Sequence, residues 1–485
     1  MGRILIFTSL LLSILSQSAF ADTKTLKIPL YASEISLDPS GVQDQSSLWV
    51  SRQINCQLVR LSEGKIVNEA AEQIEFTTPL KLKISLKNNV FFTDGEKVTS
   101  DDVINSFLYL KDSRKVLRNI FDHIKTINKI DNRTIEIELT RPSPILRTLS
   151  SPHYSIHKSS FIEQISRGTE DWSFPIGCGG YQIVPSGKKE LLMLKSITGK
   201  LNIYFFLSQK NQVESKEAHK FDIISSPVVG SDIHEKDFIL KKVFDPYHLF
   251  FGLNTKKDTW KAKSKRCSLF SKINVQSILK AYGDQVELAK DFFPRGVLGY
   301  KPRSPLIKTQ EHDYIEKKNN VYDQSFCLST LSVSIPEKYR ESFLEVFKSI
   351  YKKVDGKSIL DTKNFVKIFQ NSNCDIIAMG LKSNYLDGYE YLLTYSEREV
   401  NLTGYWDEML VKKIKESQSI ENAEDRAQIY QSLSEEILGT CTIYPIATIP
   451  YKSIYVKKGL MTPDIGKVPL NEYYLGNVFY EKAKQ

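Results

Sequence analysis

Alternating apolar and charged residues predict two strands in the first third of the chain. Leu82, Ile84 and Leu86 alternate with lysine and serine, and the same period of two returns at residues 135–139. A period of two places the apolar side chains on one face of a strand. We therefore expect two strands, each with one buried face and one charged face.

Between these strands, the stretch FFTDGEKVTSDDVINSF, residues 91–107, begins with a turn. Asp94 and Gly95 form a turn signal, because glycine adopts positive φ at no steric cost and aspartate bonds to its own backbone. The apolar pair that precedes the turn and the polar residues that follow it predict a sharp reversal of the chain.

A helix is expected to begin at residue 100, directly after this turn. Thr99 and Asp102 have the spacing of a capping box, and the carboxylate also complements the helix dipole. One side of the helix is apolar, and we expect it to pack on the sheet. The residues of this stripe are Val103, Ile104, Phe107 and Leu110.

The first 21 residues are typical of a cleavable secretory signal. Arg3 supplies the charged end, residues 4–15 are apolar, and Ala19 and Ala21 have the spacing of a cleavage site. About twelve apolar residues are too few for a membrane anchor, since a spanning helix needs about 20. No cysteine follows residue 21 directly, so we expect export without a lipid anchor.

Composition excludes several classes of protein. With 485 residues, 41% of them hydrophobic and 25% charged, the chain suits a soluble globular protein of two or three domains. The net charge of +9 is modest. The densest basic run, residues 256–266, lacks the interleaved aromatic residues that stack on bases. We therefore expect no nucleic-acid partner.

Six cysteines are scattered along the chain, and in an exported protein they can persist as disulfides. Six cysteines allow 15 pairings, and the sequence does not choose among them. Buried free thiols are the alternative. Because no C-x-x-C spacing occurs, we expect no zinc site, no other metal and no cofactor.

Motifs of enzyme chemistry are missing from the sequence. It contains no G-x-S-x-G elbow, no H-E-x-x-H and no phosphate-cradling glycine loop. His234 and Glu235 begin like a zinc-protease motif, but the second histidine is missing. An exported hydrolase is therefore the weaker hypothesis, and a non-enzymatic protein is expected.

The turn and helix of residues 91–107 resemble the signature region of the family 5 extracellular solute-binding proteins, the peptide-binding subunits of bacterial ABC importers. In that family a strand, an F-x-D-G turn and a T-x-x-D-V helix follow one another. Further segments are similar to family motifs and occur in the same order. They are ASEISLDP (32–39), GCGGYQIV (177–184), FFGLNTKK (250–257) and KRCSLFSKINVQSIL (265–279).

The resemblance implies an α/β fold of two lobes joined by two chain crossings. This is the type II periplasmic-binding-protein fold of the cluster C kind, with a subdomain inserted in the first lobe. We expect lobe I at residues 22–57, 181–255 and 462–485, the insert at residues 58–180, and lobe II at residues 256–461.

The function implied by the resemblance is capture of a solute in the periplasm. A short peptide would bind between the lobes, and the monomeric protein would deliver it to the permease subunits of an inner-membrane ABC importer. Closure of the lobes would follow from contacts that both make to the ligand. A non-peptide solute and a sensory role are the alternatives.

Two segments would present strand edges to a peptide backbone if the resemblance holds. The alternative for each is an ordinary loop. The residues are Glu34, Ile35 and Ser36 from the first lobe, and Gly380, Leu381 and Lys382 from the second.

One departure from the family pattern concerns the ligand. Peptide binders have tryptophan and aspartate where this chain has Leu381 and Asn384, and the aspartate pairs with the α-ammonium of the peptide. Asn384 can accept a hydrogen bond, but a neutral acceptor binds an ammonium more weakly. Asp387 or Glu390 would compensate from nearby, and the alternative is that Asn384 only caps a turn.

Overall fold

The computed structural model covers the whole chain, and its placement is described for most residues. The predicted signal peptide, the pair His234 and Glu235, and Asn384 lie outside the described residues. The described residues are 24–32, 34–41, 44–62, 65–113, 124–141, 143, 145–208, 213–226, 236–303, 322–332, 334–360, 364–383, 386–420, 422–463, 465 and 473–480.

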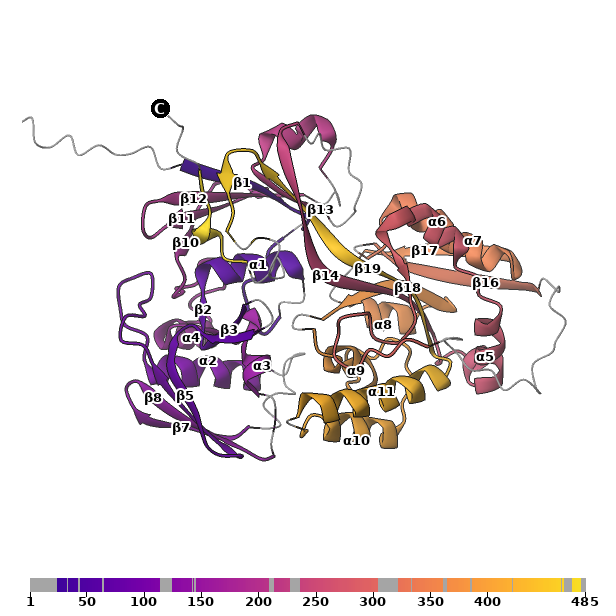
Figure 1. Ribbon diagram of the computed structural model, residues 1–485, viewed down its shortest axis with the longest axis horizontal. Helices are drawn as coiled ribbons and strands as arrows, with labels where there is room; N and C mark the ends of the chain where they lie inside the picture. The colour runs from indigo at the N-terminus through magenta and orange to yellow at the C-terminus, as the bar shows by residue number, and fades with distance from the viewer. Residues whose placement is uncertain are drawn as a thin grey trace, which may run out of the picture.

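Two bodies lie side by side and are joined by long strands (Figure 1). Lobe I contains a four-stranded sheet of order β1-β12-β11-β10 with α1 beside it, and the insert below them. The elements of the sheet and its helix are β1 (Lys24–Leu30), β10 (Tyr181–Val184), β11 (Leu191–Ser196), β12 (Leu201–Leu207) and α1 (Gln45–Ile54).

The insert is built around an antiparallel sheet of order β5-β6-β8-β7, covered on one face by α2. Its elements are β2 (Cys56–Gln57), β3 (Val59–Ser62), β4 (Lys65–Asn68), β5 (Ala71–Thr78), β6 (Lys81–Leu86), α2 (Ser100–Asp112), β7 (Ile124–Asp131), β8 (Thr134–Leu139), α3 (Ile145–Leu149), β9 (Ser155–Ile156) and α4 (Ser159–Arg167).

The structure confirms both predicted strands and the helix between them. The alternating apolar residues of β6 and β8 are buried, and α2 begins at Ser100 as expected. Gly95 has φ of +91°, which explains the glycine at the turn. The stripe of Val103, Phe107 and Leu110 is fully buried against the sheet.

Asp102 does more than cap its own helix. Its Oδ2 accepts the Thr99 backbone N–H at 2.8 Å, which is the backward bond of the capping box. Its Oδ1 accepts the Ser159 backbone N–H, also at 2.8 Å, at the start of α4. One carboxylate therefore fixes α2 against α4, so the T-x-x-D motif is part of the scaffold.

The insert joins lobe I through a narrow neck, which we define as residues 54–56 and 177–179. A disulfide links Cys56 to Cys178 across it. The Gly179 N–H donates to the Ile54 carbonyl at 2.9 Å. A Cβ on Gly177 would lie 1.9 Å from that same carbonyl oxygen, so only glycine permits this approach. The motif GCGG closes the neck.

Lobe II has a sheet with helices on both faces. It is formed by the second half of β14 and the first half of β19 together with β18, β16 and β17. Its elements are α5 (Lys263–Ser271), α6 (Gln276–Tyr282), β15 (Glu287–Leu288), β16 (Tyr322–Leu331), α7 (Glu337–Lys348), β17 (Tyr351–Ile359), α8 (Phe365–Gln370), β18 (Ile376–Lys382), α9 (Tyr389–Ser396), α10 (Glu408–Ser417) and α11 (Ala423–Gly439).

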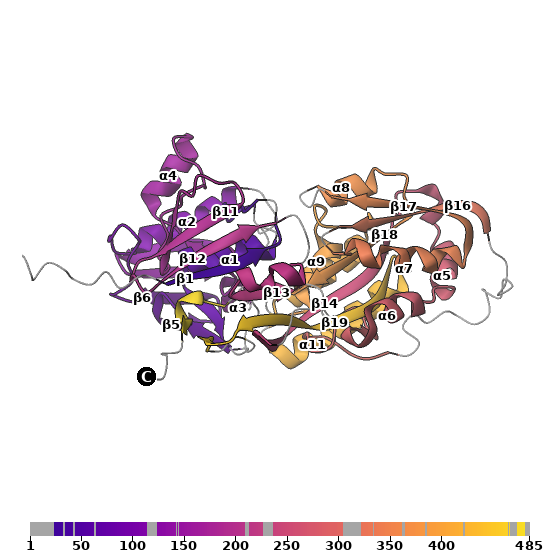
Figure 2. The same cartoon turned by 90° about the horizontal axis from the view of Figure 1, so that it is seen from above.

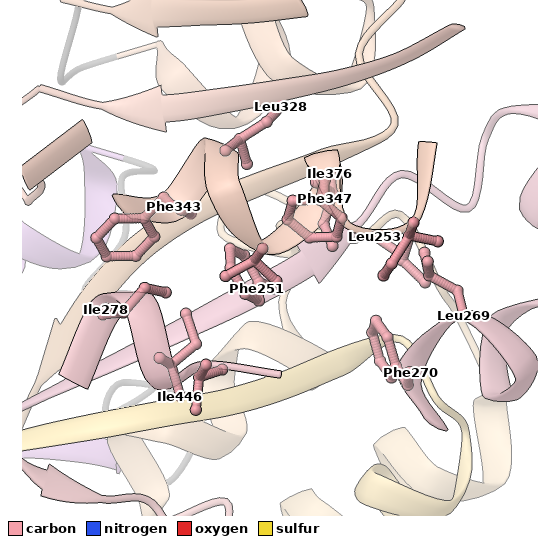
Figure 3. Packing of buried hydrophobic residues seen from close by; sticks show 14 of the residues in the cluster. Phe251, Leu253, Leu269, Phe270, Ile278, Leu328, Phe343, Phe347, Ile376 and Ile446 are labelled. Carbon is pink, nitrogen blue, oxygen red and sulfur yellow. The ribbon is translucent and has the colours of Figure 1, made fainter. Parts of the chain in front are cut away.

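Aromatic residues fill one side of this sheet (Figure 3). Phe251 of β14 packs edge-on against Phe343 and Phe347 of α7, with ring centroids 6.0 and 5.0 Å apart. Ile278 of α6 and Phe270 of α5 belong to the same core. A second core, between the sheet and α8, α9 and α11, buries the opposite face.

Two strands cross between the lobes, β14 (Phe238–Leu253) and β19 (Ile443–Lys457), while β13 (Ile223–Ser226) pairs only with the lobe I half of β19. Figure 2 shows β14 and β19 running from one lobe into the other. Along β14 the buried residues change from the lobe I core at Val243 to the lobe II core at Leu249. The crossings therefore lie before the expected boundary at residue 255, and the exact domain limits stay a prediction.

The antiparallel pairing of β14 with β19 changes register where they cross. Phe244 pairs with Tyr451 and Tyr247 pairs with Ile449, so two residues of β14 lie opposite one residue of β19. These unpaired positions include Pro246 and Pro450, which have no backbone N–H to donate. The ladder is thus interrupted on both strands between the lobes.

All six cysteines form disulfides, which decides among the open pairings. Besides Cys56–Cys178, the pairs are Cys267–Cys441 and Cys327–Cys374. The alternative of buried free thiols is wrong. The second pair joins α5 to the start of β19, and the third joins β16 to the segment before β18, so two of the three lie within lobe II.

The last described residues lie on lobe I, where β20 (Leu460–Met461) pairs with β21 (Phe479–Tyr480). Tyr473 and Leu475 belong to the lobe I core. Within the described ranges, no helix combines the length and apolar character needed to cross a membrane.

Candidate ligand-binding site between the lobes

The predicted segment of lobe II, residues 380–382, forms the end of β18. One edge of this segment pairs with residues 247–249 of β14. On its other edge, the described pairing with β16 ends at Ala378. The backbone at the end of β18 therefore extends beyond the β16 ladder, as an edge that accepts an added strand would.

Gly380 is required by a neighbouring ring. A Cβ at this position would lie 2.2 Å from Cε1 of Tyr247, which lies on the neighbouring strand β14. Burial raises the pKa of Tyr247 to about 12, so its hydroxyl stays protonated. The glycine thus allows the tyrosine ring to cover the backbone of β18.

Lys382 connects the two lobes. Its Nζ forms an ion pair with Oδ1 of Asp245 at 2.7 Å, on the crossing strand β14. The same Nζ donates to Oε1 of Gln45, the first residue of α1 in lobe I, at 3.0 Å. Burial and the nearby charge of Lys382 lower the pKa of Lys452, on β19, to about 8. Two lysines therefore share one aspartate at the crossing.

The predicted segment of lobe I meets the same helix. Ser36 donates its backbone N–H to Oγ of Ser47 at 3.0 Å, while Ile35 packs against the lobe I core and Glu34 is exposed. Ser47 lies two residues after Gln45, the partner of Lys382. Both predicted segments, far apart in sequence, therefore converge on the first turn of α1.

Asp387 is buried and already bonded. Its Oδ1 accepts the Tyr389 backbone N–H at 3.0 Å. Its Oδ2 lies 3.5 Å from Nη2 of Arg426, on α11, and 3.4 Å from Nη1 of Arg147, on α3 of the insert. These bonds disfavour the suggested role of Asp387 as a substitute receptor for a ligand ammonium, because its charge is engaged by two arginines.

Glu390, the other suggested substitute, lies near the insert. Burial and, to a smaller extent, the charge of Glu390 raise the pKa of Tyr154. Glu390 also acts on the neighbouring Tyr391, whose pKa burial raises well above its usual value. The hydroxyl of Tyr391 is 3.5 Å from the Leu381 carbonyl oxygen. The start of α9 therefore belongs to the contact between the lobes.

The sequence did not point to Gln45, Arg147 or Asp245. Each makes its contact with a residue more than 130 positions away, and none belongs to a recognisable motif. A single polar residue in a helix or strand does not reveal from the sequence which distant residue it will contact. Among the described residues, no group of three or more potential ligands could hold a metal ion.

A model of the bacterial extracellular solute-binding proteins, family 5, matches residues 65–399. The chain belongs to this family. The family is one of solute-binding proteins and not of enzymes, so the match supports a binding protein over an enzyme.

Among curated proteins, this chain shares 27% identity over 143 residues with the peptide transport periplasmic protein SapA of Salmonella typhimurium. The match covers 24% of this chain and 26% of SapA. The chain thus aligns with only about a quarter of that relative.

Solved structures resemble this protein over almost its whole length. A dipeptide-binding protein of Pseudoalteromonas sp. SM9913, in complex with Met-Leu, has a TM-score of 0.81 at 13% identity, covering 94% of this chain and 100% of that chain. AgaA of Agrobacterium tumefaciens R10, in complex with agropinic acid, has a TM-score of 0.75 at 18% identity, covering 94% and 99%. At these identities the likeness shows the fold, and the predicted two-lobed fold class is confirmed.

Proposed function

We propose that this family 5 member captures a short peptide between its lobes in the periplasm and delivers it to an inner-membrane ABC importer. The convergence of the two predicted segments on the first turn of α1 carries this proposal. Ser36 reaches Ser47, and Lys382 reaches Gln45, at 3.0 Å each. A peptide placed there would meet backbone from both lobes.

The end of β18 supplies the chemistry for a peptide backbone. A strand edge bonds to the main chain of a peptide whatever its side chains, which gives affinity with little selectivity. The likeness to a dipeptide-binding protein supports this class of ligand. We propose no catalytic step and no resident cofactor, so the ligand would be released unchanged.

A non-peptide solute is the second candidate. AgaA shares the fold and was solved with agropinic acid. In this chain Asn384 stands where the resemblance implies an amine-binding carboxylate. Without that carboxylate, a free amino terminus would add less to the binding energy.

Native mass spectrometry tests the proposal. The protein is stripped of ligand by unfolding and refolding with its disulfides intact, then mixed with a library of di- to pentapeptides. We expect a 1:1 complex whose released ligand has the mass of an intact peptide. Retention of a non-peptide solute from periplasmic extract, with no peptide retained, would favour the second candidate. Shortened peptides after incubation would contradict a binding role without turnover.

A further inference from the structure

Arg147 reaches from the insert toward lobe II. It belongs to α3, a helix that Figure 1 shows on the side of lobe I nearer to the second lobe. Its Nη1 is 3.4 Å from Oδ2 of Asp387. The Arg147 side chain is 28% exposed, whereas Asp387 is 3% exposed. The arginine is therefore the partner that a solute can reach.

Asp387 has a second, more deeply buried cation within its own lobe. Arg426, 4% exposed, approaches the same Oδ2 at 3.5 Å, and the Tyr389 N–H occupies Oδ1. Two guanidiniums thus share one carboxylate, which leaves one positive charge in surplus among these three side chains. The Arg147 contact is also longer than the 2.7–2.9 Å of a strong charge-assisted bond. A better placed anion would displace it.

The position of this surplus charge bears on the ligand. The Asp387 backbone N–H donates to Oγ of Ser383 at 3.1 Å, which holds Asp387 next to the end of β18. At position 384 of the sequence the resemblance implies a carboxylate for the peptide's ammonium, and the chain has Asn384 instead. An arginine that contacts Asp387 attracts an anion and repels an ammonium there. Glu390 adds a negative charge nearby, so an anion gains only where it touches Arg147 directly.

We propose that Arg147 recognises a carboxylate of the ligand, and that Asp387 occupies its guanidinium until the ligand arrives. This inference rests on the proposed capture of a solute between the lobes. A carboxylate can meet the planar guanidinium with two parallel N–H···O bonds, which a single oxygen of Asp387 does not offer. The ligand class is then a small peptide or other solute with a free carboxylate. Its anionic end lies at the contact between Arg147 and Asp387.

A matched pair of peptide libraries tests this. One tripeptide library carries free carboxylates and the other carries C-terminal amides, and both keep free amino termini. We expect the unmodified protein to bind the acids at least about tenfold more tightly than the amides, as for a desolvated charge-assisted pair. Arg147→Gln should abolish the preference, and Arg147→Lys should keep part of it. Arg167→Gln, which removes an exposed arginine of α4, serves as the control and should change nothing.

Asp387→Asn separates recognition from a merely structural contact. If Arg147 binds the ligand, removing its competitor should keep or increase the preference for acids. If the two residues only hold the lobes together, both variants would weaken acids and amides alike, and the inference would be overturned. Equal binding of acids and amides by the unmodified protein would also overturn it but leave the proposed function standing. Binding of neither library would contradict the proposed peptide function as well.

Discussion

The neck joins the insert to lobe I, and the crossing joins lobe I to lobe II, but the two connections are built in opposite ways. At the neck, a disulfide, a backbone hydrogen bond and closely packed glycines hold residues 54–56 against 177–179. At the crossing, the ladder of β14 and β19 loses register near Pro246 and Pro450, and charged side chains bridge the lobes. The neck is therefore built to be rigid, and motion is expected at the crossing.

This difference has a functional meaning. If the insert moved on its neck, Arg147 would change position relative to the rest of lobe I as well as to lobe II. A rigid neck lets lobe I and the insert move as one body, so that closure brings α3 and α1 to the ligand together. Hydrogen bonds and ion pairs that bridge the lobes, unlike a covalent bond, can break and reform during such motion.

Removal of the neck disulfide should have the largest effect. Cys56→Ala with Cys178→Ala opens a link between residues separated by 122 positions, and we expect a loss of about 2 to 4 kcal/mol in the free energy of unfolding. Chemical denaturation measures this loss. Hydrogen exchange should accelerate in α2 and β6 of the insert and stay unchanged in β16 of lobe II. Uniform acceleration across both lobes would contradict the insert's dependence on its neck.

Gly179→Ala should weaken the same neck by packing alone. The added Cβ would lie 2.5 Å from the Gln53 carbonyl oxygen, a backbone atom that cannot rotate away. We expect a loss of about 1 to 3 kcal/mol in thermal or chemical unfolding. Gly439→Ala is the matched control, since nothing lies within 4 Å of its new Cβ. That control should leave stability unchanged or raise it by up to about 1 kcal/mol, and an equal loss in both variants would remove the packing argument.

At the crossing, stability should depend on pH through Lys452. Its pKa falls from 10.5 to about 8 on folding. Between these values the unfolded chain binds a proton that the folded protein has lost, so stability rises with pH from about 8 to 10.5, and below 8 the contribution of this group no longer changes with pH. We expect a gain of about 1 kcal/mol relative to Lys452→Met, because Lys452 is only partly buried. Parallel pH profiles for the two proteins would contradict this.

Sequence reasoning succeeded where short-range patterns decide the structure. The period of two in β6 and β8, the turn at Gly95 and the start of α2 depend on neighbouring residues, and all were found. The family resemblance supplied the two lobes. The disulfide pairing and the cross-lobe contacts of Arg147 and Lys382 depend on long-range geometry, which no local pattern encodes.

The crossing shows the same limit. The interruption at Pro246 and Pro450 lies inside strands of 16 and 15 residues. On both sides of it, β14 and β19 are paired. Nothing in the local pattern says that one half of a strand belongs to another lobe. The core to which each half contributes becomes visible only when both strands are placed against their partners.

Distance measurements by electron paramagnetic resonance test the central claim most directly. Spin labels are introduced as non-canonical amino acids at exposed Lys83 of the insert, Lys195 of lobe I and Lys412 of lobe II. On addition of a saturating tripeptide library to ligand-stripped protein, the Lys195–Lys412 distances across the crossing should narrow to a single shorter population. The Lys83–Lys195 distances across the neck should stay the same. A change across the neck with no change across the crossing would contradict the account.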